Sequence, residues 1–255
     1  MMGTAMSKRF EGKVALVTGA SKGIGAEIAA RLAAEGAAVA VNYSASKEAA
    51  DRVVAAIAAK GGKAVAVHGN LADAKDVKSV VAETVKAFGA IDILVNNAGI
   101  YEFAPLEAIT PEHFHRQFDL NVLGLLLVSG EAVRHFNPKG GSIINISSGV
   151  STIAPANTAV YTATKASVDA ISAVLAKELA PRKIRVNAIN PGMIVTEGVI
   201  SAGLHEGDMR KWIESTTPLG RVGTVQEIAA AVAFFASDDA SYVTGETLHV
   251  TGGLR

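Results

Sequence analysis

The chain has 255 residues, of which 49% are hydrophobic, and its 24 basic residues balance its 24 acidic ones. This composition is typical of a compact globular protein, and the absence of a basic excess argues against a nucleic-acid-binding protein. No cysteine is present, which excludes disulfides and thiolate chemistry and fits a reducing, cytoplasmic location.

The N-terminal segment lacks the apolar run of a signal peptide. We expect residues 1–9 to lie outside the fold, as a disordered leader or a remnant of cloning. No later segment has the uninterrupted apolar length that a membrane span needs, so we expect no membrane partner.

Short apolar segments rich in Val and Ile recur along the chain and are typical of strands buried on both faces of a parallel sheet. They are Val14–Thr18, Ala37–Val41, Ala64–Val67, Ile91–Val95, Ser142–Ile146, Ile184–Ile189 and Thr247–Val250. Stretches rich in Ala, Lys and Glu separate them and stop at glycine, as helices do. The clearest are Glu27–Ala34, Lys47–Lys60 and Asp76–Phe88, and Thr110 with Pro111 marks the start of another.

Alternating strands and helices predict an α/β fold: one Rossmann-type, doubly wound parallel sheet of about seven strands with helices on both faces. No Pro-rich or Ser-rich linker interrupts the chain, so we expect a single domain over residues 1–255. The segment Thr196–Thr217 has mixed polarity and no clean period, and we expect it to be an irregular substrate loop.

The first apolar segment runs into a glycine-rich turn followed by a helix. The turn comprises Thr18, Gly19, Ala20, Ser21, Lys22, Gly23, Ile24 and Gly25. Glycine permits a tight turn and close approach of a pyrophosphate to the backbone, and the helix N-terminus supplies unpaired N–H groups. Taken alone, the turn favours a dinucleotide site, with a purely structural turn as the alternative.

Further motifs follow in a fixed order. They are Asn96-Asn97-Ala98-Gly99 after the fourth apolar segment, then Asn121, Ser148, Tyr161-x-x-x-Lys165 and Pro191-Gly192. Together with the GxxxGxG spacing of the turn, this order resembles the short-chain dehydrogenase/reductase family over nearly the whole chain. The branch it resembles includes 3-oxoacyl-(acyl-carrier-protein) reductases and glucose 1-dehydrogenases.

The end of the second strand bears on the choice of cofactor. Proteins that bind NAD usually have an Asp or Glu there, which holds the ribose hydroxyls. This chain has Asn42 instead, followed by Tyr43 and Ser44. Asn42 would not repel a 2′-phosphate, and Lys22 and Ser44 could contact one. We therefore expect NADP(H) to be preferred, with use of NAD(H) possible.

The resemblance implies further cofactor contacts around the adenosine and the nicotinamide. These are Asn70 and Leu71 after the third strand, Asn97, Ala98 and Gly99, Tyr161 and Lys165, and then Pro191, Gly192, Ile194 and Thr196. The six histidines show no metal-ligand spacing, and we expect no metal site.

Tyr161 and Lys165 are four residues apart in a helical stretch and so share one face. A tyrosine can give a proton to the oxygen of a ketone while a nicotinamide cofactor supplies hydride. Its phenol has an ordinary pKa of about 10, which a nearby ammonium would lower. The resemblance makes Ser148, rather than its neighbour Ser147, the residue that holds the substrate oxygen, and gives Asn121 a water that relays protons to the lysine.

These residues predict an NADP(H)-dependent oxidoreductase acting on a ketone or secondary alcohol, such as a carbonyl or 3-oxoacyl reductase. Two alternatives stay open: a sugar or secondary-alcohol dehydrogenase working oxidatively, and a catalytically silent NADP-sensing protein. The resemblance also implies a homotetramer. We expect substrate choice to depend on Tyr101–Phe103, Gly149–Asn157 and Thr196–Thr217. Candidates for an apolar pocket are Ile153, Val199, Leu204 and Trp212.

Overall fold

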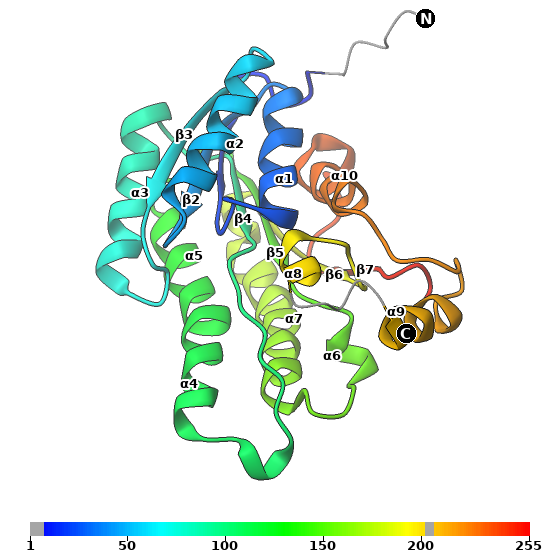
Figure 1. The fold of residues 1–255 in the computed structure, drawn as a ribbon. Coiled ribbons are helices and arrows are strands. Elements are labelled where there is room, and N and C mark those ends of the chain that lie inside the picture. The colour runs from blue at the N-terminus through cyan, green and yellow to red at the C-terminus, as the bar shows by residue number, and fades with distance from the viewer. Residues whose placement is uncertain (1–7, 202–206) are drawn as a thin grey trace, which may run out of the picture.

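The structure, a computed structural model, describes residues 8–201 and 207–255. Within these ranges, parallel strands form one sheet in the order β3-β2-β1-β4-β5-β6-β7 (Figure 1). The strands are β1 Val14–Val17, β2 Ala38–Tyr43, β3 Lys63–His68, β4 Ile93–Asn96, β5 Gly141–Ile146, β6 Ile184–Pro191 and β7 Thr247–Val250. The predicted doubly wound parallel sheet is confirmed, and each strand boundary lies within two residues of its prediction.

Helices cover both faces of the sheet and divide the core into two clusters. On one face lie α1 Gly23–Ala34, α2 Lys47–Ala59 and α10 Val225–Ala236, with α1 beside α10 (Figure 1). On the other lie α3 Ala74–Phe88, α5 Leu125–Val133 and α7 Ala159–Leu179. Burial of Val and Ile on both sides explains why the strands of the sheet are almost continuously apolar.

The helix predicted at Pro111 is α4, Pro111–Phe118, and the hydroxyl of Thr110 accepts a hydrogen bond from the N–H of His113. A π-helical turn, Asp119–Gly124, joins α4 to α5 (Figure 1). Such turns occur mostly as local bulges at functional sites. This one contains Asn121.

The folded chain begins earlier than expected. Residues 1–7 of the expected leader lie outside the described residues, but Lys8 and Arg9 belong to the described fold. The guanidinium of Arg9 pairs with the buried carboxylate of Glu35 at 2.7 Å. Together with Arg31, it holds the pKa of Glu35 below its ordinary value despite burial, which acts in the opposite direction.

The segment expected to be an irregular loop is largely helical where it is described. It contains α8, Glu197–Ser201, and α9, Gly207–Thr216, while Leu204 lies outside the described residues. The expectation of irregular structure was therefore wrong for these two helices. Both are short, and α9 carries charged and apolar residues together, so neither has the long apolar stripe that sequence periodicity detects.

The strand order reverses between β1 and β4, the outward-running halves of the sheet being β2-β3 and β5-β6-β7. Open α/β sheets bind ligands at such a point, beyond the carboxyl ends of the strands. Both the glycine turn after β1 and the asparagine motif after β4 lie there. No helix within the described ranges has the length and apolarity that crossing a membrane requires.

Candidate active site

The glycine turn packs directly onto the turn that follows β4. Gly19 has a φ of +59°, and a β-carbon there would lie 2.8 Å from the Cα of Ala98. A β-carbon on Gly25 would lie 2.5 Å from Nδ2 of Asn97. No side chain fits at either position without displacing backbone, which explains glycine at both.

Thr18 and Asn97 lock the two turns together. The hydroxyl of Thr18 accepts hydrogen bonds from the backbone N–H groups of Asn97 at 2.9 Å and Ala98 at 3.0 Å. In return, the amide of Asn97 donates to the carbonyls of Thr18 at 2.9 Å and Gly19 at 3.0 Å. The N-terminus of α1 is thereby held in place, and an anion is favoured at such a helix end.

Asn42 does not project from the end of β2 toward solvent. Its side chain is buried, with Oδ1 accepting from the N–H of Gly19 at 3.1 Å. Its Nδ2 donates to the carbonyls of Val67 at 3.3 Å and Gly69 at 3.1 Å. The amide thus connects the glycine turn to the end of β3, a structural role that the sequence did not predict.

The other residues expected around the adenosine differ in accessibility. Lys22 and Ser44 are exposed, whereas Tyr43 is buried with its ring centre 5.3 Å from that of His68. Asn70 is exposed and Leu71 is buried. Lys22, Ser44 and Asn70 are therefore the exposed polar residues of this set.

Tyr161 and Lys165 lie one turn apart on α7, as predicted, with the ammonium of Lys165 5.8 Å from the centre of the Tyr161 ring. The ammonium donates a hydrogen bond to the carbonyl of Ile146 at 3.0 Å. Burial lowers the pKa of Lys165 to about 8. Gly99 lies beside it, since a β-carbon on Gly99 would lie 3.7 Å from the ammonium.

Burial also raises the pKa of Tyr161 to about 12, although its hydrogen bond with Ser148 acts in the opposite direction. The sequence predicted a lowered value, on the basis of Lys165 as a neighbouring cation. In the protein alone, loss of hydration disfavours the phenolate more strongly, and the lowering expected beside an oxidised nicotinamide stays a prediction. Tyr161 is held as the neutral phenol.

Ser148 and Ser147 are separated clearly by their contacts. Ser148 follows β5, hydrogen-bonds with Tyr161, and accepts from the N–H of Val150 at 3.3 Å. The hydroxyl of Ser147 is buried and donates to the carbonyl of Lys165 at 3.0 Å. Of the two serines, Ser148 is the one that contacts the phenol, and its role in holding the substrate oxygen stays a prediction.

Asn121 lies in the π-helical turn and contacts both the chain after β4 and α7. Its Oδ1 accepts from the N–H of Ile100 at 2.9 Å, and its Nδ2 donates to the carbonyl of Ile100 at 2.8 Å. Nδ2 also donates to the hydroxyl of Thr164, the neighbour of Lys165, at 3.1 Å. The structure therefore brings Asn121, Ser148, Tyr161 and Lys165 together around the carboxyl ends of β4 and β5.

The residues expected beside the nicotinamide follow β6. Pro191 accepts a hydrogen bond at its carbonyl from the N–H of Gly149 at 2.8 Å, and a β-carbon on Gly192 would lie 2.9 Å from the Cα of Thr251. Ile194 is buried. Thr196 lies beside the glycine turn, since a β-carbon on Gly23 would lie 3.6 Å from the Thr196 side chain. This segment therefore closes the site opposite α7.

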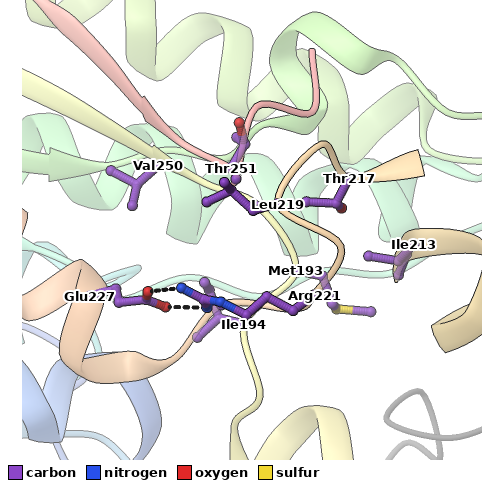
Figure 2. Close-up of a pocket in the computed structure, with 12 residues that line it drawn as sticks. Met193, Ile194, Ile213, Thr217, Leu219, Arg221, Glu227, Val250 and Thr251 are labelled. Carbon is purple, nitrogen blue, oxygen red and sulfur yellow. Dashed lines mark hydrogen bonds and ion pairs between the residues drawn. The ribbon is translucent and has the colours of Figure 1, made fainter. Parts of the chain in front are cut away.

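A small pocket of about 110 Å³ adjoins this closing segment (Figure 2). Figure 2 shows Arg221 and Glu227 paired beneath it, with Nη2 and Oε1 separated by 2.6 Å. The Arg221 guanidinium lowers the pKa of Glu227 to about 2. Neither Tyr161 nor Ser148 lines the pocket, whereas Gly192 and Ile194, two residues expected beside the nicotinamide, do.

The sequence analysis missed one contact at the glycine turn. The carboxylate of Glu197, the first residue of α8, accepts a hydrogen bond from the N–H of Gly23 at 3.3 Å. Gly23 is the first residue of α1, whose N-terminus favours anions. The contact joins residues 174 positions apart in the sequence, and no local sequence pattern predicts it.

Comparison with known proteins agrees with this arrangement. A family model described as enoyl-(acyl carrier protein) reductase matches residues 19–255. An uncharacterized oxidoreductase of Methylorubrum extorquens is 55% identical over 98% of this chain and 100% of its own length. A 3-oxoacyl-(acyl-carrier-protein) reductase of Staphylococcus aureus is 43% identical over 95% of this chain and 98% of its own.

Among solved structures, a short-chain dehydrogenase from Burkholderia cenocepacia, in complex with NADP, superposes with a TM-score of 0.91 at 37% identity. The alignment covers 96% of this chain and 99% of that one. Sequence motifs, sheet order and these relatives agree, and the chain belongs to the short-chain dehydrogenase/reductase family of oxidoreductases.

Proposed function

We propose that the protein is an NADPH-dependent ketone reductase in which Tyr161 gives a proton to the substrate oxygen. The observation that carries this proposal is the state of Tyr161: a partly buried, neutral phenol, hydrogen-bonded to Ser148 and one helical turn from Lys165. A proton donor must be protonated at the working pH, and burial ensures that for this tyrosine.

The residues around the glycine turn fit a dinucleotide. Gly19 and Gly25 allow the glycine turn to pack closely against the turn after β4, and the N-terminus of α1 presents N–H groups to a pyrophosphate. When bound, the nicotinamide supplies hydride to the carbonyl carbon. The NADP complex of the Burkholderia cenocepacia relative supports the choice of NADP, as does the absence of an acid at Asn42.

Each polar group of the cleft has a task in this reaction. Ser148 would hold the carbonyl oxygen within reach of the phenol, an orientation effect that lowers the barrier. Lys165, buried and hydrogen-bonded to the carbonyl of Ile146, would hold the nicotinamide ribose and replenish the proton of Tyr161. Asn121 fixes both Ile100 and Thr164, and so maintains the distance between α7 and the chain after β4.

The test is an initial-rate screen of ketones, 3-oxoacyl thioesters, secondary alcohols and sugars with both nicotinamide cofactors. We expect NADPH consumption with at least one ketone or 3-oxoacyl thioester, at a higher kcat/KM than with NADH. Consumption only in the oxidative direction would favour the sugar or alcohol dehydrogenase. Cofactor binding without turnover of any compound would favour the silent NADP-sensing protein.

A further inference from the structure

The chain between Gly99 and Ala104 is fixed by two amide side chains from one helical face. Asn121 makes two hydrogen bonds to the N–H and carbonyl of Ile100, at 2.9 and 2.8 Å. Gln117 does the same for Glu102, accepting from its N–H and donating to its carbonyl, both at 3.2 Å. Gln117 is fully buried, so both of its bonds are made away from water.

This pair of contacts determines the direction of the side chains between them. The N–H and carbonyl of one residue point the same way only where the chain is extended, and in an extended chain residues two apart share a face. Gln117 and Asn121 are themselves four apart and so lie on one helical face. Ile100 and Glu102 are consequently held in register, and Tyr101 and Phe103 share the opposite face.

That face looks onto the proton donor. The ring centres of Tyr101 and Phe103 are each 6.1 Å from that of Tyr161 and 5.8 Å from each other. The backbone N–H of Ala104 donates to the carbonyl of Asn157 at 2.9 Å, which anchors the far end of the segment. Two aromatic rings thus lie beside the phenol of Tyr161, within the distance range of favourable ring pairs.

Two of these rings are only partly covered by the protein. Tyr101 is 42% exposed and Phe103 is 53% exposed, even though their backbone is rigidly held. The hydroxyl of Tyr101 faces α8, since a β-carbon on Gly198 would lie 3.6 Å from it. Tyr101 therefore lies between the segment after β4 and α8, and part of the Tyr101 and Phe103 rings remains exposed beside the reaction centre.

We propose that Tyr101 and Phe103 form an aromatic wall that selects ketones with a flat aromatic ring attached to the carbonyl. A flat ring can lie against two fixed aromatic rings with good contact, whereas a saturated ring of equal size cannot. The carbonyl of such a ketone, in the plane of its ring, would reach Tyr161 and Ser148. This inference rests on the proposed ketone reductase activity.

The electrostatics of the cleft agree with this placement. Tyr101 contributes to the raised pKa of Tyr161, which follows if the two hydroxyls lie near each other on the same side of the cleft. The side chain of Phe103 has no polar atom, so hydrogen bonding to water does not explain why it is exposed. Both residues act on the substrate, and the proton transfer itself needs neither.

The experiment compares acetophenone with cyclohexyl methyl ketone, which has the same carbon skeleton but a saturated ring. The variants are Tyr101→Leu, Phe103→Leu and the double variant, with Tyr101→Phe as the matched control that keeps the ring. We expect the ratio of kcat/KM for the two ketones to fall about tenfold in the double variant, mainly through KM for acetophenone. The ratio should be unchanged in Tyr101→Phe.

Gln117→Leu removes the two hydrogen bonds to Glu102 and leaves Tyr101 and Phe103 unchanged. We expect it to lower the ratio of kcat/KM for the two ketones, by less than the double variant does. For every variant, a circular-dichroism spectrum and a thermal unfolding midpoint that match those of the parent show that the fold is intact. A ratio unchanged in the double variant would overturn the inference while leaving ketone reduction in place.

A binding measurement tests the aromatic wall independently of the proposed reductase activity. Benzamide resembles acetophenone but is not reduced, and its contact with the protein can be followed by saturation-transfer NMR. We expect a signal for benzamide that the double variant loses and Tyr101→Phe keeps. That result without turnover of any ketone would refute the reductase and retain the aromatic wall, whereas an unchanged signal in the double variant would refute the wall.

Discussion

The ammonium of Lys165 lies over the ring of Tyr161, 5.8 Å from its centre; Lys165 is buried and Tyr161 is partly buried. Burial moves the pKa of the two groups in opposite directions, to about 8 for Lys165 and about 12 for Tyr161. In each case the neutral form is favoured, because neither ion is fully hydrated in the cleft. The two residues therefore titrate in different pH ranges.

The first prediction concerns pH. The parameter kcat/KM for NADPH reports ionisations of the free enzyme. Lys165 is an ammonium below its pKa of about 8 and loses its charge as the pH rises through that value. We expect kcat/KM for NADPH to be flat from about pH 6 to about pH 7 and to fall above pH 8. Tyr161, whose pKa is about 12, stays neutral throughout this range and adds no second limb.

The control for the pH profile is Lys165→Met, which has no proton to lose. Its kcat/KM for NADPH should be low at every pH and show no decline above pH 8. A parent profile without the alkaline decline, or a decline that persists in Lys165→Met, would assign the ionisation to another group.

The second prediction concerns Tyr161→Phe, which removes the proton donor and keeps the ring. General acid catalysis typically contributes about 10²- to 10⁴-fold, and we expect a loss of kcat of that order. The dissociation constant of NADPH, measured by fluorescence titration, should change little. Ser148→Ala should also lower kcat, because the hydrogen bond to Tyr161 and the contact with the substrate oxygen are both lost. A kcat within tenfold of the parent in Tyr161→Phe would contradict the proposed role.

The sheet could be predicted closely from the sequence because its physics is local. Val and Ile runs such as Ile143 and Ile144 are buried on both sides, and glycines such as Gly36 and Gly89 end the preceding helices. The reactive residues were also predictable, since Tyr161 and Lys165 lie four apart on a helix and need only a local periodicity to share a face.

Other parts of the site depend on contacts between distant segments, which no local pattern encodes. The Asn42 side chain points inward because its amide donates hydrogen bonds to the carbonyls of Val67 and Gly69. Gln117 clamps Glu102 only because α4 packs beside the chain that follows β4. The effect of burial on the pKa of Tyr161 could not be predicted for the same reason: the degree of burial is a property of the complete fold.

The third prediction follows from the buried amide of Asn42. The substitution Asn42→Asp introduces an acid at the position where NAD-binding proteins usually have one. It also removes the Nδ2 donor. The carbonyls of Val67 and Gly69 would then face a carboxylate. We expect the free energy of unfolding to fall by about 1–3 kcal/mol, the usual cost of a buried unsatisfied group, measured by urea denaturation.

The matched control for Asn42 is Ser44→Asp, which introduces the same charge at an exposed position two residues later. It should leave stability unchanged and weaken NADPH binding relative to NADH by repulsion of the 2′-phosphate. Full stability of Asn42→Asp would contradict the structural role of the amide. Equal NADPH affinity in Ser44→Asp and the parent would place the 2′-phosphate elsewhere.

The last prediction concerns Glu197, whose carboxylate accepts from the N–H of Gly23 at 3.3 Å. That N–H belongs to the N-terminus of α1, where a cofactor pyrophosphate would need the same donors. A carboxylate at a helix N-terminus typically contributes about 0.3–1 kcal/mol, so its neutralisation should tighten NADPH binding about two- to fivefold. The measurement is the dissociation constant of NADPH for Glu197→Gln, with Glu83→Gln on the exposed face of α3 as the control that changes the same charge far from the turn. At saturating NADPH the cofactor occupies the donors of α1, so we expect kcat to be unchanged. Weaker binding in Glu197→Gln would show instead that the carboxylate supports the bound state.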